Sequence, residues 1–69
     1  MKQNRYCIEI RGERPWQFNA RNHSKAAAEV RMALGILAPV DEEKLRNRGV
    51  ERILCDGAEI PLAEFGEGS

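Results

Sequence analysis

Two runs of alternating apolar and polar residues, separated by a short turn, constrain the fold of this chain more than any other feature. The first run covers residues 5–11 and has one apolar and one mostly polar face: Tyr6, Ile8 and Ile10 against Cys7, Glu9 and Arg11. The second run, residues 16–20, alternates in the same way. A period of two is typical of a half-buried strand. Because the residues between the runs include Gly12 and Pro15, the pattern predicts a β-hairpin.

A helix is predicted directly after the hairpin, beginning at Asn22 or Ser24 and reaching Gly35. Either residue can cap it, since a short side-chain oxygen accepts a hydrogen bond from an unpaired N–H of the first turn. Three consecutive alanines favour a helix and allow it to lie close to a sheet. We expect one stripe of apolar side chains to cover that sheet: Ala26, Val30, Ala33, Leu34 and Leu37.

The middle of the chain, residues 41–48, is either a short surface helix or a structured loop. Asp41 is a suitable cap, and acidic residues precede basic ones, which matches the helix dipole at both ends. Leu45 is nearly the only apolar residue there, and Gly49 is a natural stop. Since so little apolar surface is available, the sequence leaves both readings open.

A second hairpin closes the pattern. Residues 50–55 are predicted to form the third strand, and Asp56-Gly57 is a preferred pair for a two-residue type I′ turn. Residues 58–62 then form a fourth strand. This strand should be short or lie at a sheet edge, because Pro61 has no N–H to donate to a ladder.

The predicted fold class is therefore α+β, with the order ββα(α)ββ: a small antiparallel sheet of two hairpins with one main helix between them. Whether a short second helix follows the main one is the alternative left open for residues 41–48. Residues 1–65 are expected to form a single compact domain, since 69 residues leave no room for two. Residues 66–69 are expected to be a disordered tail. A main helix covers only one side of such a sheet, so the other side requires an explanation.

The third strand has apolar residues on both faces. Strict alternation places Ile53 and Cys55 on one face and Val50 and Leu54 on the other. Two interpretations remain open. Leu54 packs under the second helix, or the uncovered sheet face is a contact surface for a protein partner or a second copy of the chain.

Catalysis, cofactors and metals find no support in the residue inventory. The chain has no glycine-rich phosphate loop, no GxSxG and no HExxH, and it contains one histidine. Two cysteines and one histidine, spread along the chain, do not match the spacing of a zinc site. The chain also lacks a signal-peptide pattern and an apolar run long enough to span a membrane, so we expect a cytoplasmic, non-enzymatic protein with reduced thiols.

Charge is distributed unevenly along the sequence although the formal net charge is zero. Residues 1–35 carry a net charge of +4 and residues 36–69 a net charge of −4. Such polarity can favour association with another protein or with a second copy. The alternative is that the charges only solvate the surface and intermix once the chain folds. Small chains without catalytic residues are often adaptors, inhibitors or accessory subunits, many of them from phages and other mobile elements. The sequence thus predicts an interaction module, with these candidate residues on the open sheet face: Cys7, Glu9, Arg11 and Leu54.

The alternative is nucleic-acid binding by the first hairpin and the start of the helix. Basic residues interleaved with aromatic ones are typical of surfaces that stack bases and hold phosphates. The residues that would do this are Arg11, Arg14, Trp16, Arg21, His23 and Lys25. A pI of about 6.6 and the need for the aromatic side chains in a small core both weigh against this reading.

Overall fold

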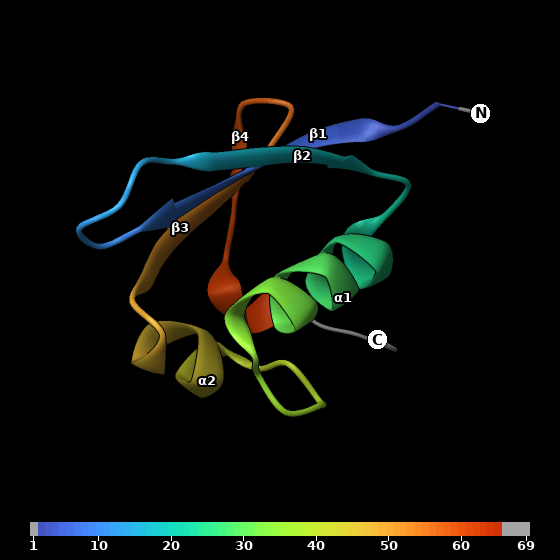
Figure 1. Cartoon of the computed structure of the whole chain (residues 1–69). Coiled ribbons are helices and arrows are strands. Elements are labelled where there is room, and N and C mark those ends of the chain that lie inside the picture. Colours follow the sequence, from blue (N-terminus) through green and yellow to red (C-terminus); the bar gives the residue numbers. More distant parts are fainter. Residues whose placement is uncertain (1, 66–69) are drawn as a thin grey trace.

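A computed structural model describes residues 2–65, which form a four-stranded antiparallel sheet with all helices on one side (Figure 1). The elements in chain order are β1 (Asn4–Ile10), β2 (Trp16–Ala20), α1 (His23–Leu34), α2 (Glu42–Asn47), β3 (Val50–Cys55), β4 (Ala58–Ile60) and the 3-10 turn η1 (Leu62–Glu64). The sheet order is β2-β1-β3-β4. The predicted α+β class and the order ββα(α)ββ are confirmed, and the structure decides the point that the sequence left open, since Glu42–Asn47 form a helix.

The first hairpin pairs in the register that its alternation requires. Tyr6 lies opposite Phe18, and Ile8 lies opposite Trp16, so apolar side chains of both strands face the helices. Tyr6 and Ile8 are fully buried, while the two aromatic residues of β2 are half-buried because β2 is an edge strand. The first hairpin thus supplies part of the sheet side of the core, and Val50, Ile53 and Ile60 of the second hairpin supply the rest.

Helix α1 begins and ends where the local signals predict. Asn22, rather than Ser24, is the cap: its side chain accepts a hydrogen bond of 2.8 Å from the Lys25 N–H. Gly35 ends the helix in the left-handed conformation, with a φ of 67° that a side chain would disfavour. The residues that the helix buries are Ala26, Ala27 and Val30.

The predicted apolar stripe of α1 is wrong at its C-terminal end. Ala33 is exposed, and Leu37 lies beyond the end of the helix with 81% of its surface accessible. The reason is that Gly35 redirects the chain, so the helical period no longer places Leu37 above Val30. Ile36 enters the core in its place.

Residues 42–47 form a helix rather than a loop. Asp41 caps it, its side chain accepting a 2.9 Å hydrogen bond from the Lys44 N–H. Leu45, its one buried residue, is fully enclosed by the core. A single well-buried leucine and a cap are therefore sufficient to hold this short helix against the rest of the domain.

Strand β3 contains a bulge that the alternation of its sequence does not reveal. Glu9 lies opposite Arg52, but the next residue, Ile10, lies opposite Val50, so Glu51 is an extra residue on β3. The bulge turns Val50 to the helix side, where it is buried. The expectation that Val50 shares a face with Leu54 is therefore wrong, because one inserted residue reverses the alternation.

The second hairpin turns as predicted. Asp56 and Gly57 have φ values of 52° and 87°, as a type I′ turn requires. Strand β4 lies at the sheet edge and is shorter than predicted, because Pro61 is outside it and leads into η1. Phe65 follows and is fully buried. The predicted tail at 66–69 lies outside the described residues.

Candidate functional site

The face of the sheet that points away from the helices has a small apolar centre. Cys7 lies opposite Gln17 on β2 and opposite Leu54 on β3, and Leu54 lies in turn opposite Glu59 on β4. Cys7 and Leu54 are both half-buried. Both helices and η1 lie on the opposite side of the sheet (Figure 1). We call this surface the open face and define it by these residues: Cys7, Glu9, Arg52, Leu54 and Glu59.

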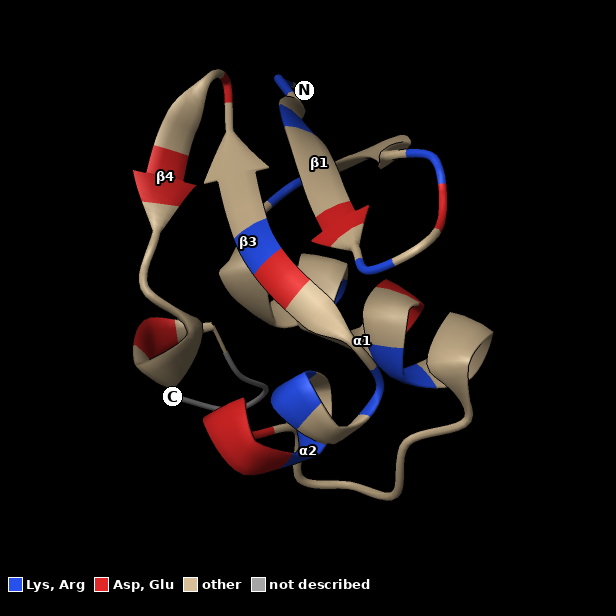
Figure 2. Cartoon of the chain, turned by 90° about the vertical axis from the view of Figure 1, so that its left-hand side faces the viewer, with Lys and Arg blue, Asp and Glu red and all other residues tan. Residues whose placement is uncertain are grey.

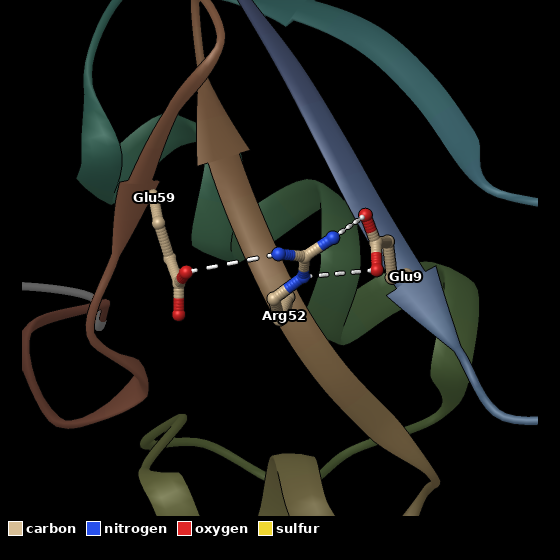
Figure 3. A network of polar contacts seen from close by, with 3 residues as sticks. All are labelled: Glu9, Arg52 and Glu59. Atoms are coloured by element: carbon tan, nitrogen blue, oxygen red, sulfur yellow. Dashed lines mark hydrogen bonds and ion pairs between the residues drawn. The ribbon is translucent and has the colours of Figure 1, made fainter.

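A charged network borders the apolar centre on one side. Arg52 of β3 donates two hydrogen bonds to Glu9 of β1, from Nε at 3.0 Å and from Nη2 at 2.9 Å. On its other side, the guanidinium lies 3.9 Å from the Glu59 carboxylate of β4. Figure 3 shows Arg52 reaching toward a carboxylate on each neighbouring strand. The hydrogen bonds that Arg52 donates to Glu9 raise the pKa of Arg52 above its ordinary value.

Further polar pairs continue this border. Arg5 donates a 3.0 Å hydrogen bond to Gln17 across β1 and β2. Arg11, just beyond the end of β1, lies 3.5 Å from the Glu51 carboxylate, and both side chains are largely exposed. Figure 2 shows basic and acidic segments interspersed along β1, β3 and β4. The +4 and −4 halves of the sequence therefore intermix on folding, since two of these ion pairs join one half to the other.

The four predicted interaction residues do not all lie in one place. Cys7, Glu9 and Leu54 share the open face, whereas Arg11 lies beside it, next to the β3 bulge. Sequence reasoning missed Arg52 and Glu59. Their link to Glu9 depends on which strands pair and in what register, and no local pattern states that.

The six predicted nucleic-acid residues divide into two groups at opposite ends of β2. Arg11 and Arg14 belong to the connection before Trp16, whereas Arg21, His23 and Lys25 follow the end of the strand. The indole of Trp16 stacks on the ring of Phe18, with centroids 4.6 Å apart. Both aromatic rings point to the helix side, so the open face offers no platform of aromatic rings for base stacking.

His23 makes a contact that the sequence did not indicate. Its Nδ1 lies 2.8 Å from the hydroxyl oxygen of the fully buried Tyr6, and the two rings meet edge to face. Phe65 lies beside both rings, with centroids 6.3 Å from Tyr6 and 6.4 Å from His23. The histidine, at the first residue of α1, thus provides the hydrogen bond that a buried phenol requires.

Residues 2–65 contain no group of three or more histidine, cysteine, aspartate or glutamate side chains placed to hold a metal ion. Cys7 and Cys55 are free, half-buried, and on opposite faces of the sheet. No helix in this part of the chain has the length and apolar character needed to cross a membrane.

Comparison with known proteins adds no relative. The chain matches no family model, no curated protein and no solved structure. The class that residues 2–65 define is a small α+β domain whose four-stranded antiparallel sheet has the described helices on one face.

Proposed function

We propose that this protein is a non-catalytic interaction module that binds protein through the open face, and that the occupant is a second copy of the chain. The observation that supports this most directly is the Cys7–Leu54 pair at the centre of a sheet face that no helix of residues 2–65 covers. An apolar centre within a polar, charged border is the usual anatomy of a protein interface.

The charges of this surface favour a second copy over a strongly charged partner. With its border included, this surface carries three cations and three carboxylates, so both signs are present in equal number: Arg5, Arg11 and Arg52, with Glu9, Glu51 and Glu59. A two-fold dimer brings the same patch of both subunits together. Because this patch carries both signs of charge, two copies of it can meet without net repulsion.

Leu54→Glu tests the proposal. We expect the wild-type chain to be a dimer and the variant a monomer, because a carboxylate at the apolar centre would be desolvated without a partner. Light scattering behind a sizing column, at low and high salt, gives the molar mass. Leu37→Glu is the matched control, since Leu37 is highly exposed on the helix side and should leave the dimer intact.

Each outcome has a distinct meaning. A dimer at both salts supports the apolar centre, whereas a dimer found only at low salt assigns the association to charge pairs instead. A wild-type chain that is a monomer at both salts contradicts the second copy as the occupant.

Nucleic-acid binding has its own test. If the basic residues around β2 held phosphates, the double variant with Arg14→Glu and Arg21→Glu would lose retention of DNA or RNA, and retention by the wild type would fall steeply with salt. Absence of retention by the wild-type chain would remove this alternative.

A further inference from the structure

The outer edge of β2 carries backbone groups that no strand of residues 2–65 pairs. On the central strand β1, the Arg5 N–H donates a hydrogen bond to the Asp56 side chain, and the Arg5 C=O accepts one from the Asp56 N–H, so both groups point to the β3 side. In an antiparallel sheet the backbone groups of successive residues point to opposite sides, so the N–H and C=O groups of Tyr6 and Ile8 point to β2. Their partners are Phe18 and Trp16. Trp16 and Phe18 therefore direct their backbone groups to β1. Gln17 and Asn19 alternate with them along β2, so their N–H and C=O groups point away from the sheet.

A seam between this edge and α1 has a hollow at each end. One hollow is lined by residues of β2 and of the first half of α1: Asn19, Ala20, Arg21, Lys25, Ala28 and Glu29. The other is lined by Trp16 with residues of the first turn and the end of α1: Ile10, Gly12, Arg14, Ala33 and Leu34. Figure 1 shows α1 running beneath β2.

The floor of this seam is apolar. Trp16 and Phe18 point to the helix side and remain half-buried, because β2 has no neighbour on its outer side. On α1, the small side chains of Ala28 and Ala33 leave room opposite them. A strand added at this edge would form backbone hydrogen bonds with Gln17 and Asn19. Because successive side chains of a strand point to opposite faces, every second side chain of the added strand would enter the space above α1.

Positive charge flanks both ends of the edge. Arg14 precedes β2, while Arg21 and Lys25 follow it, and none of the three forms an ion pair with a carboxylate of residues 2–65. Glu13 and Glu29 are the acidic residues of the two hollows. Acidic side chains at both ends of an incoming strand would therefore find unpaired cations.

The same charges argue against a second copy at this edge. If two β2 strands paired antiparallel through Gln17 and Asn19, Phe18 would lie at the two-fold axis. Arg14 of one copy would then lie beside Arg21 of the other, at both ends of the pair. Like charges next to one another across strands are destabilising, so the edge favours a different, acidic strand.

We propose that the β2 edge is a peptide-binding site, which takes an extended segment of another protein as a fifth strand. The segment has apolar side chains at alternate positions, facing Trp16 and Phe18, and acidic residues before and after them. This site is separate from the open face, and its occupant differs in chemistry from the one proposed there.

The probe is a displayed library of nine-residue peptides with the pattern acid-acid-apolar-polar-apolar-polar-apolar-acid-acid, free of tryptophan. A second library replaces every acid with lysine. The wild-type chain should enrich the acidic library and not the basic one. Enriched peptides are then titrated by the emission of Trp16, the only tryptophan, which should shift to the blue as a strand covers it. Equal enrichment of both libraries, or no blue shift, overturns the proposal.

Asn19→Pro and Asn19→Ala form the decisive pair of variants. Proline removes the outward N–H without breaking a ladder bond within the sheet, whereas alanine removes only the side chain. We expect Asn19→Pro to weaken binding about tenfold and Asn19→Ala to change it less than about twofold. Equal affinities for the two variants would contradict strand addition.

Two further measurements separate the possible failures. Peptides N-methylated at the positions that face β2 test the same hydrogen bonds on the wild-type chain, so the proposal stays testable if Asn19→Pro does not fold. If the N-methylated peptides bind as tightly as the unmethylated ones, strand addition is overturned. Leu54→Glu should leave peptide affinity unchanged within about twofold. This variant therefore distinguishes a failure of the open face from a failure of the β2 edge. A larger loss of affinity would contradict the claim that the two sites are separate.

Discussion

At the scale of single residues, Tyr6 connects more of the molecule than any other side chain described above. It is fully buried, stacks on Phe18 with centroids 5.7 Å apart, and shares a hydrogen bond with His23. Burial raises the pKa of its hydroxyl above the ordinary value of 10.0. The hydroxyl is therefore kept protonated in the folded chain at a pH where the unfolded chain ionises it.

This difference predicts that stability falls in alkali. Between pH 10 and the higher pKa of the folded state, the unfolded chain has lost the tyrosine proton and the folded chain retains it. The free energy of unfolding should then fall by up to about 1.4 kcal/mol per pH unit, and below pH 10 this contribution is constant. Urea unfolding at a series of pH values measures the slope. Tyr6→Phe should reduce it; an unchanged slope would assign the alkaline loss to other groups.

At the scale of elements, α2 shows how little sequence is needed to hold a short helix. Six residues are too few for an isolated helix in water, so its stability comes from Leu45 in the core and from the Asp41 cap. The Lys44 ammonium adds hydrogen bonds to the Leu37 and Pro39 carbonyls, at 3.0 and 2.8 Å, and so joins the helix to the segment before it.

Leu45→Ala should therefore destabilise the domain more than loss of the cap does. We expect the free energy of unfolding to fall by about 2–4 kcal/mol, because a fully buried side chain leaves a cavity. Asp41→Ala should cost about 1 kcal/mol, which is typical for removal of an N-cap. Guanidinium unfolding followed by Trp16 emission measures both. A smaller effect for Leu45→Ala than for Asp41→Ala would show that α2 is not packed through its leucine.

At the scale of the whole molecule, the core closes only when the end of the described chain returns to its beginning. Phe65 is fully buried against Tyr6 of β1 and beside His23 of α1. The chain has no disulfide, since Cys7 and Cys55 are both free. In a domain this small, one large aromatic side chain is a substantial part of the core.

Phe65→Ala should bring the domain close to unfolding. Removing a buried phenylalanine costs about 3–5 kcal/mol, whereas a chain of this length has a total stability of about 3–10 kcal/mol. We expect a large drop in the thermal midpoint measured by circular dichroism. Met32→Ala is the control, because Met32 is 73% exposed and should change stability by less than about 0.5 kcal/mol. Equal midpoints for the two variants would contradict the role of Phe65.

Features that depend on neighbouring residues were predictable. The hairpin, the capped helix starts and the Asp56-Gly57 turn each rest on side chains a few residues apart, and the structure confirms them. The candidate site was predictable only in part. Alternation placed Cys7 and Glu9 on one face, but it could not pair Glu9 with Arg52, since those residues are 43 positions apart in the chain.

The sequence by itself determined the two hairpins, the main helix and their order, because the period of two, the caps and the turn residues act over short distances and need no partner. It left residues 41–48 open between a helix and a loop. Tertiary structure decided the rest. The sheet order β2-β1-β3-β4 left the β2 edge unpaired, the bulge at Glu51 turned Val50 into the core, and Phe65 completed it. Each of these depends on burying apolar surface between distant segments, which is a property of the packed chain as a whole and not of any short stretch of it.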